Sequence, residues 1–539
     1  MAFIKAQKLV RDENGNITSG SASIIDTEYT NQGKYHASHS VREKLGKVLW
    51  LSDDKKRGIF ISPTRGLIEY NASTDVFSSV NKDDERLGGT KAFPQTQIHT
   101  VFGDAYMLLS FLEKEGLLSV LRTVFQKNED YERVLCHILH GVLKDGSKIS
   151  CDNFLMKSFA SYVFPDVAES SLKSDTRFFT MMGSEETKLK FFKEFTAFMQ
   201  KKSQKFGKGC YVDSTPLPND IVDNPFNALS SHGIGGSAIM ERLALVLDDE
   251  SGLPVWYDVI PGNVLDINTV MKVVNDVADS LRIIIDSLVV DAGYVSKELL
   301  MAFHIGTEKT VIGRMPAKKG FPYKNLYWDV KNLLGKGKYS FVRNSHVYFG
   351  HRERIKIFGV EEYAYIYVDE PNAMKGLRDY ILKNPDEYAA LKDKDKDWMT
   401  VKFGFFILVS NIETTPEEML SMYFGRCDTE TVFKTSKEYL DLLPLSKWTD
   451  VTVRGKILSD IINTIVLLLL RKKITSSGLS TSEIYGKCQS LMCFRNSSGM
   501  VTVETPSRQV KDYYSLLGIE VPAHVEVEKF KKNNLKLCV

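Results

Sequence analysis

The chain has 539 residues and a formal net charge of +2, from 70 Lys and Arg against 68 Asp and Glu. One hydrophobic core rarely serves a chain of this length, so we expect roughly two to four domains. Hydrophobic residues make up 43% and charged residues 26% of the chain, as in ordinary soluble globular proteins. The near-neutral balance excludes a globally basic nucleic-acid-binding protein, so any DNA-binding surface must be local.

The seven cysteines are scattered and form no C-x-x-C pair. This pattern disfavours a disulfide framework or a zinc ribbon and favours a reducing compartment. The first residues, MAFIKAQKLVRDENG, turn polar too soon for a secretory leader. The most apolar run, IVLLLLRKK, is far shorter than the ~20 residues that span a bilayer, and it predicts a buried helix with a basic end. We therefore expect a cytoplasmic protein without a membrane segment.

The first two hundred residues divide into two predicted regions. Residues 1–100 are predicted to be β-rich, with short strands at 47–51, 58–62 and 66–71 between polar, glycine-containing breaks. Residues 101–206 carry the apolar spacing of helices, as in YERVLCHILHGVLK and KLKFFKEFTAFMQKK.

From residue 207 the apolar spacing changes to that of strands. GCYVDST predicts a short strand that ends in Asp213, and the next two apolar runs predict a hairpin that turns at Gly252. A helix capped by Asp266 follows, and then SLVVDAGY predicts a buried strand that ends in Asp291. A further helix and the strand KTVIGRM complete residues 207–313. Three strands in series followed by helix–strand–helix–strand is the order of a ribonuclease-H-like core, so the predicted fold class is α/β.

Residues 314–400 are predicted to interrupt this core. They are rich in aromatic, β-branched and cationic residues, which indicates a β-rich insertion. The stretch GFFILVSN resumes a buried strand, so the second part of the core is expected at residues 401–475. Residues 476–539 form a tail with a predicted hairpin around MCFRNSSGMVTVE.

A helix is predicted directly after this resumed strand. Thr415 is its expected N-cap, Pro416 takes the first helical position and Glu418 completes a capping box. Gly425 lies inside the predicted helix and costs about 1 kcal/mol relative to alanine.

Four polar residues of this helix share one face. Tyr423, Arg426, Glu430 and Lys437 have spacings that place them within an arc of roughly 60°. A phenol, two cations and a carboxylate on one stripe suit a metal ion with phosphate beside it. The alternative is an ordinary charged helix face with i,i+4 pairs.

Three carboxylates form the predicted reactive centre. Asp213 and Asp291 both follow apolar runs, and functional groups of α/β sheets gather at strand ends. Glu430 adds a carboxylate from the helix. Three oxygen ligands suit Mg²⁺ or Mn²⁺ rather than zinc, and two such ions about 3.5–4 Å apart support in-line phosphoryl displacement. A single strand-end aspartate is more often structural than catalytic, so the prediction depends on the combination.

The combination resembles the DDE transposases of bacterial insertion sequences, in the cut-and-paste branch that carries a Tyr–Arg–Glu–Lys helix. The resemblance extends over about residues 207–475 and includes the contexts DSTPL and DAGYVS and the segment GLPVWYDVIPGNVLDINTV. It implies that Asp213, Asp291 and Glu430 bind two Mg²⁺ or Mn²⁺ ions. It also implies DNA contacts by a tyrosine, three cations and an insertion tryptophan that stacks on a flipped base: Tyr423, Arg426, Lys437, Arg314 and Trp398, with Trp328 as the alternative tryptophan.

The resemblance further implies a function. The chain would bind double-stranded DNA at the terminal inverted repeats of its element through the β-rich and helical regions of residues 1–206. It would then cleave the DNA and join it to target DNA, acting as a homodimer in the synaptic complex. The alternatives are a two-metal nuclease without strand transfer and a non-catalytic, transposase-derived DNA-binding protein, which the intact triad disfavours. A covalent role for Tyr423 is disfavoured because that chemistry requires no metal triad.

Overall fold

The structure is a computed structural model, and the residues it describes are 2–11, 17–32, 34–80, 84, 86, 99–143, 151–169, 175–218, 227–233, 236–264, 266–304, 308–327, 330, 333–425, 432, 447–496 and 500–536. The chain divides into two compact units, Met1–Gln97 and Ile98–Val539, which we describe one at a time.

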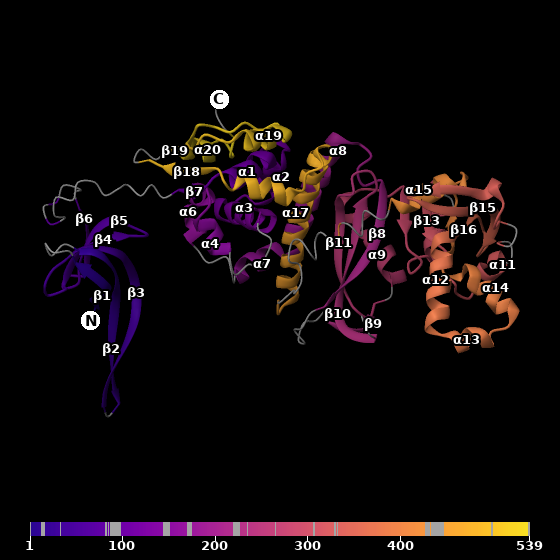
Figure 1. Cartoon of the computed structure of the whole chain (residues 1–539), viewed down its shortest axis with the longest axis horizontal. Coiled ribbons are helices and arrows are strands. Elements are labelled where there is room, and N and C mark those ends of the chain that lie inside the picture. The colour runs from indigo at the N-terminus through magenta and orange to yellow at the C-terminus, as the bar shows by residue number, and fades with distance from the viewer. Residues whose placement is uncertain are drawn as a thin grey trace. The chain divides into compact units, whose positions relative to one another are not determined.

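The first unit is a six-stranded antiparallel sheet in which the strands follow their order in the chain (Figure 1). Its strands are β1 (Ala2–Arg11), β2 (Ile17–Gln32), β3 (Lys34–Leu51), β4 (Arg57–Ser62), β5 (Gly66–Asn71) and β6 (Val76–Ser79). Ile24, Val48, Phe60 and Tyr70 form the centre of its own core. The sequence predicted β4, β5 and only the last residues of β3. It missed β1 and β2 because their Ser-, Thr- and Lys-rich stretches are stabilised by pairing with each other rather than by local apolar runs.

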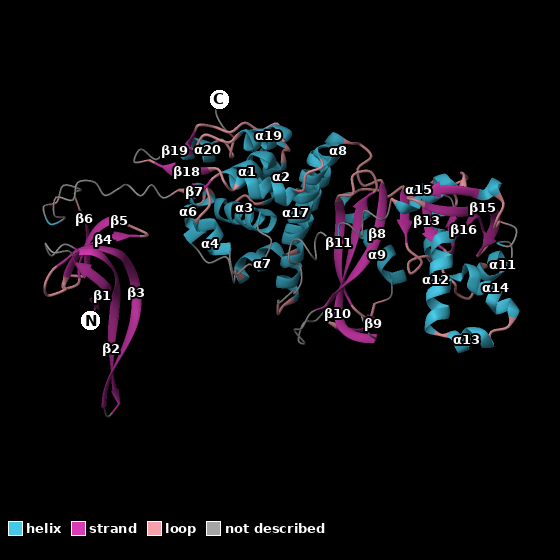
Figure 2. Cartoon of the chain, in the orientation of Figure 1, coloured by secondary structure: helices cyan, strands magenta, loops and turns pink. Residues whose placement is uncertain are grey.

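The second unit begins with a helical region (Figure 2). Its helices are α1 (Gly103–Lys114), α2 (Leu117–Val124), α3 (Asn128–Leu143), α4 (Cys151–Met156), α5 (Ala160–Val163), α6 (Pro165–Glu169), α7 (Thr176–Met182) and α8 (Glu185–Lys202). The long helix α17 (Asp450–Ile474) packs against α3 and α7, although it is far from them in the sequence. It contains the apolar run that begins at Ile465, and Arg471 is in its basic last turn, as predicted. None of the described helices is long and apolar enough to cross a membrane.

Two glycines allow α7 and α17 to approach each other closely. A Cβ atom on Gly455 of α17 would overlap the carbonyl oxygen of Phe179, and one on Gly183 would overlap the carbonyl oxygen of Val451. Backbone therefore meets backbone at this crossing, and neither helix has a flexible side chain that could move aside.

We predict that Gly455→Ala lowers the stability of the protein by about 2–3 kcal/mol, because the added methyl group forces the two backbones apart. Gly486 of α18 (Thr481–Cys488) is the matched control, since a Cβ atom there meets nothing within 4 Å. Gly486→Ala should raise the melting temperature, because alanine favours a helix by about 1 kcal/mol over glycine. Thermal unfolding followed by circular dichroism measures the melting temperature of both variants. Equal melting temperatures for Gly455→Ala and Gly486→Ala would contradict the close backbone contact between α7 and α17.

A ten-stranded mixed sheet follows the helical region along the chain, and Figure 1 shows its strands from β8 to β16. Its order is β11-β10-β8-β12-β13-β17-β16-β15-β14, with β9 paired to β10. The strands are β8 (Gly209–Pro218), β9 (Ala228–Gly233), β10 (Gly236–Asp248), β11 (Pro254–Pro261), β12 (Ser287–Val290), β13 (Thr310–Arg314), β14 (Ser340–Arg343), β15 (His346–Ile357), β16 (Val360–Asp369) and β17 (Phe405–Ser410). The predicted hairpin is confirmed as β10 and β11, and β12 runs parallel to both β8 and β13.

The helices near this sheet follow the predicted order. Helix α9 (Asp266–Leu281) connects β11 to β12, α10 (Lys297–His304) connects β12 to β13, and α15 (Pro416–Phe424) follows β17. The predicted capping box of α15 is confirmed, with Thr415 accepting a hydrogen bond from the backbone of Glu418. Gly425 is the C-cap of α15.

The predicted β-rich insertion needs a correction. Its strands β14, β15 and β16 extend the central sheet, because β16 pairs with β17 along Tyr363–Val368. After β16 the chain forms three helices: α12 (Glu370–Lys383), α13 (Pro385–Ala390) and α14 (Asp393–Lys402). Asp369 caps α12, with Pro371 in its first turn, so residues 370–402 carry helix-start signals that the composition of the whole segment concealed.

The C-terminal residues pack onto the helical region. The predicted hairpin is confirmed as β18 (Met492–Arg495) and β19 (Met500–Val503), which form a sheet with β20 (His524–Glu526) and β7 (Thr100–Val101). The helices α19 (Arg508–Leu516) and α20 (Val527–Lys532) complete it, and the Tyr514 hydroxyl donates to the carbonyl of Gly103 over 2.5 Å. The last residues and the start of the helical region therefore share one core.

Candidate active site

The two predicted aspartates occupy neighbouring positions of the central sheet. Strands β8 and β12 are paired in parallel up to Val212 and Val290, and the next residue of each strand is Asp213 or Asp291. Neighbouring strands lie about 4.8 Å apart, and residues at the same register point to the same face. Both aspartates are half-buried, so the sheet holds two carboxylates side by side at the boundary of the core.

The position of Asp213 differs from the prediction in one respect. Asp213 was expected to end its strand, but β8 continues to Pro218 because it stays paired with β10, where Asp213 lies opposite Leu245. Only the pairing with β12 ends at Val212. The carboxylate of Asp213 therefore sits where one neighbouring strand stops and the other continues, on a backbone that β10 still supports.

Helix α15 brings a third element to the aspartates. Tyr423 is 5% exposed, and its hydroxyl donates a hydrogen bond of 3.1 Å to Oδ1 of Asp291. Gly425 lies against Tyr211, whose hydroxyl a Cβ atom on Gly425 would overlap. Tyr211 is two residues before Asp213 in β8 and hence on the same face. The C-terminal end of α15 therefore covers the face that carries both aspartates.

Gly425 is thus a packing position beside the candidate site, which sequence reasoning did not identify. Its cost to helix propensity counted against a helix here, whereas the structure uses the missing side chain for close contact with Tyr211. The sequence contains both Gly425 and Tyr211, but their contact can be recognised only when the pairing of β8 with β12 is known.

The strands of the insertion hold α15 in place. Arg343 of β14 donates to the Ser421 hydroxyl and lies 5.6 Å from the ring centre of Phe424. The Tyr367 hydroxyl donates over 2.7 Å to the carbonyl of Pro416 at the start of the helix. The position of Tyr423 on Asp291 therefore depends on residues from outside the predicted core, and sequence reasoning did not single these residues out.

Arg314 lies on the strand beyond Asp291. Strand β13 is paired in parallel with β12 up to Gly313, opposite Val290, so Arg314 is the next residue in register with Asp291. Its side chain is exposed, and the guanidinium lies 5.5 Å from the ring centre of Phe406. Asp213, Asp291 and Arg314 therefore follow one another across three strands, two anions and then a cation.

The other predicted site residues are less directly placed. Arg426, Glu430, Lys437 and Trp328 lie outside the described residues. Trp398 of α14 is half-buried and packs edge-on against Tyr327 and Phe405, with ring centres 4.3 and 5.6 Å away.

Some of the cations of the insertion are paired with carboxylates. Arg352 pairs with Glu413 at 2.8 Å and Arg354 with Glu361 at 3.1 Å. Lys318, Lys319 and Lys324 are exposed.

The donor chemistry of the site fits a hard divalent cation. Two carboxylates at adjacent register positions offer oxygen ligands, which Mg²⁺ and Mn²⁺ prefer. Within the part of the chain that the structure describes, no group of three His, Cys, Asp or Glu side chains is arranged to hold a metal, and the proposed third ligand, Glu430, lies outside that part. The nearby thiol of Cys210 is buried, and burial raises its pKa, so it is not a nucleophile.

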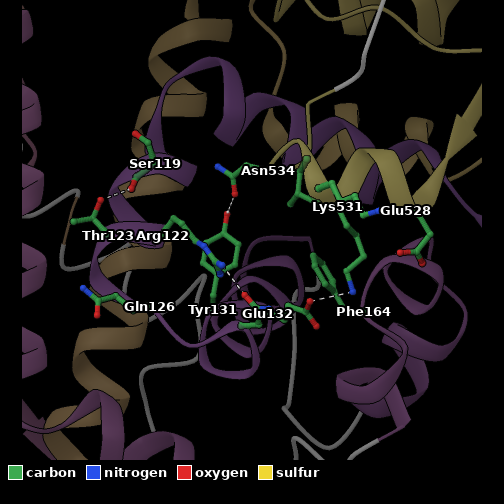
Figure 3. A pocket seen from close by; sticks show the side chains of 13 residues that line it. Ser119, Arg122, Thr123, Gln126, Tyr131, Glu132, Phe164, Glu528, Lys531 and Asn534 are labelled. Carbon is green, nitrogen blue, oxygen red and sulfur yellow. Dashed lines mark hydrogen bonds and ion pairs between the residues drawn. The ribbon is translucent and has the colours of Figure 1, made fainter.

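The structure also has a pocket in the helical region (Figure 3). Its lining residues come from 119–164 and 528–535, outside the segments that carry the two aspartates. The Tyr131 hydroxyl donates to Asn534 over 2.9 Å at its wall, and Lys531 pairs with Glu132 at 3.0 Å. None of the predicted site residues lines this pocket. We therefore place the candidate active site at the aspartates.

Comparison with known proteins defines the class. Residues 208–459 match the family model described as a transposase DDE domain. Asp213, Asp291 and Tyr423 all lie in this range, and so does Glu430. The chain therefore carries a DDE transposase domain, and the protein is an enzyme of the DDE transposase class. Enzymes of this class use divalent metal ions.

Two further comparisons add little. No curated protein sequence matches the chain. Among solved structures, the chain is similar to the piggyBac transposase in a cryo-EM structure of its synaptic complex with hairpin DNA. The identity is 10% and the TM-score 0.37, over 81% of this chain and 86% of that chain.

Proposed function

We propose that this protein is the transposase of a bacterial insertion sequence. It binds the terminal inverted repeats of its element, cleaves the DNA at the element's end and joins the freed 3′ end to target DNA. The observation that carries the proposal is the register of Asp213 and Asp291 together with the hydrogen bond of Tyr423 to Asp291. These contacts bring the start of the Tyr–Arg–Glu–Lys segment to the two aspartates.

The sheet order supports a ribonuclease-H-like core. Strands β11, β10 and β8 form an antiparallel meander, and β12 and β13 continue the sheet in parallel with β8. This is the strand order expected of such a core. Its catalytic acids are expected at the end of the pairing between β8 and β12, where Asp213 and Asp291 lie. We propose residues 207–313 and 401–475 as its two parts and residues 1–206 as the end-binding region.

Asp213, Asp291 and Glu430 would hold two Mg²⁺ or Mn²⁺ ions. When bound, such ions activate the attacking hydroxyl and stabilise the leaving oxygen in each phosphoryl transfer. Tyr423 orients the Asp291 carboxylate through its hydroxyl. Arg426 and Lys437 supply cations for the phosphates of the transposon end, and Trp398 or Trp328 would stack on a flipped base. Two copies of the chain would hold the two ends of one element, in the bacterial cytoplasm.

A strand-transfer assay tests this function. The substrate is a duplex that ends in the inverted repeat flanking the coding sequence, with a plasmid as target and Mg²⁺ present. We expect a nick that leaves a 3′ hydroxyl at the end of the repeat, and then a product joined to the plasmid. Cleavage without joining would favour the nuclease alternative. Binding without cleavage would favour a non-catalytic DNA-binding protein.

Arg314 is expected to contribute one phosphate contact next to the aspartates. Arg314→Gln should weaken binding to end DNA and reduce the slope of log K against log salt concentration by about 0.9. Arg378→Gln is the matched control, because Arg378 lies on α12 with its side chain 72% exposed. Fluorescence anisotropy at several salt concentrations measures the slope for each variant. Equal slopes for Arg314→Gln and Arg378→Gln would contradict a phosphate contact by Arg314.

A further inference from the structure

The two faces of the N-terminal sheet differ in chemistry. Ile4 of β1 lies opposite Ile24 of β2, and both are buried with Val48 and Phe60 in the core of this unit. Because successive residues of a strand point to opposite faces, the neighbours of these residues lie on the other side. On this second face Ile25 is buried between Phe3 and Val41, whereas the rows centred on Ser21 and Ser23 carry exposed side chains.

Lysines and small polar residues occupy this second face in two cross-strand rows. In the first row, Ser23 of β2 lies between Lys5 of β1 and Lys44 of β3. In the second row, Ser21 lies between Gln7 and Lys47. The three lysines and Gln7 are exposed. We call these six residues the lysine face: Lys5, Gln7, Ser21, Ser23, Lys44 and Lys47.

Carboxylates are segregated from the lysine face. Among the described residues of the six strands, the carboxylates of Asp26, Glu28 and Glu43 lie on the side of the sheet that carries the core. Glu43, for example, lies opposite the buried Ile24. Asp26 is paired there with Arg42 at 3.2 Å, and Glu43 with Arg65 at 2.8 Å.

The carboxylate that does lie on the lysine side of these strands is already neutralised. Glu69 of β5 lies opposite Ile59 on that side and pairs with Arg57 at 2.6 Å and with Arg86 at 2.9 Å. Hydrogen bonds from Arg86 and then Arg57 keep the pKa of Glu69 below its ordinary value, against the effect of its burial. Arg86 also pairs with Asp84 at 2.7 Å, so these two arginines and two carboxylates balance, and the unpaired carboxylate charge that could oppose the lysines is removed from this side of the sheet.

The spacing of the lysines suits a phosphodiester backbone. Neighbouring strands are about 4.8 Å apart, so the backbones at Lys5 and Lys44 flank Ser23 at a separation of about 10 Å. The intervening serines are short, so a flat approach to the sheet is open, and their hydroxyls and the Gln7 amide are hydrogen-bond donors. Lysine, serine and glutamine side chains are the usual donors to DNA phosphates.

We propose that the lysine face of the N-terminal sheet binds the phosphate backbone of duplex DNA. The proposal rests on the proposed function in one respect, that the protein acts on DNA. It deepens that function, which assigns end binding to residues 1–206, by naming one face of the N-terminal sheet as the surface that contacts the phosphates. A phosphate-contacting face contributes affinity and register rather than sequence readout.

The test compares two double variants of the full-length protein that lose the same charge. Lys44→Gln with Lys47→Gln removes two cations from the lysine face. Lys55→Gln with Lys56→Gln removes two exposed cations from the turn between β3 and β4. Binding to a duplex of the element's end is measured by fluorescence anisotropy between 50 and 200 mM salt, a range over which phosphate contacts dominate the salt dependence.

We expect the slope of log K against log salt to fall by about 1.8 in the first variant, about 0.9 for each lost contact, and to stay unchanged in the second. Adding Lys5→Gln to the first variant should lower the slope by about 0.9 more. Equal slopes for the two double variants would overturn the proposal. So would a lower oligomeric mass of the lysine-face variant without DNA, measured by light scattering, because that result assigns the face to a second copy of the chain.

Failure of this proposal can be told apart from failure of the proposed function. The aspartates lie in the other compact unit, so the lysine-face variant should still cleave end DNA at low salt and saturating protein. It should also keep the melting temperature of the wild type, since its changes are at exposed positions. If the wild-type protein itself neither binds nor cleaves DNA, the proposed function fails, whatever the slopes are.

Discussion

Asp213→Asn should abolish strand cleavage while DNA binding survives. Asparagine has nearly the same shape as aspartate, so β8 keeps its pairing with β10, but the site loses one anionic ligand. The loss of metal-assisted transition-state stabilisation amounts to several kcal/mol, or about a thousandfold or more in rate. Asp291→Asn should have an effect of the same size, because the two residues hold equivalent positions on adjacent strands.

Cleavage of a labelled end duplex measures the loss, and anisotropy on the same duplex measures binding. Asp279→Asn is the control, since Asp279 is an exposed carboxylate on α9. It should cleave at the rate of the wild type. Cleavage by the Asp213→Asn protein at the wild-type rate would show that the neighbouring carboxylates are structural only.

Removal of divalent metal should have an equally large effect. EDTA should stop cleavage completely, Mg²⁺ or Mn²⁺ should restore it, and Zn²⁺ should substitute poorly because it prefers nitrogen and sulfur ligands. Binding should also be visible without catalysis. A ligand present at 100 times its dissociation constant stabilises the folded state by about 2.7 kcal/mol, so Mn²⁺ should raise the melting temperature of the wild-type protein.

The aspartate variants separate metal binding from other effects of Mn²⁺. Two carboxylates at adjacent register positions repel each other when no cation is bound. Asp213→Asn should therefore melt in EDTA at the temperature of the wild type or above it, and Mn²⁺ should raise its melting temperature less. An equal rise of the melting temperature in both proteins, or cleavage that resists EDTA, would contradict metal binding at this site.

The contacts of α15 link these effects to the rest of the fold. Arg343, Tyr367 and Gly425 all contact or closely approach their neighbours along the helix whose Tyr423 donates to Asp291. The insertion strands thus contribute to the site without donating a ligand. They can do so because β16 pairs with β17, which makes β14–β16 part of the central sheet.

Much of the local structure was readable from the sequence alone. The capping box at Thr415, the turn at Gly252 and the buried run that begins at Ile465 all appear as predicted. Caps, turns and apolar periodicity act over a few residues, so the signal and the structure it specifies lie in the same stretch of chain. The candidate aspartates were found in the same way, from the apolar runs before them.

Only the tertiary structure decided how these parts meet. Nothing near Asp213 indicates that β8 continues to Pro218, because that depends on pairing with β10, and the adjacency of Asp213 to Asp291 depends on the register of β8 with β12. The strands β1 and β2 were missed because pairing with each other, and not an apolar run, stabilises them. The helices after Asp369 were missed for a different reason, because the mixed composition of the segment concealed their local cap signals. Local residues specify each element, whereas long-range register decides which side chains share a site.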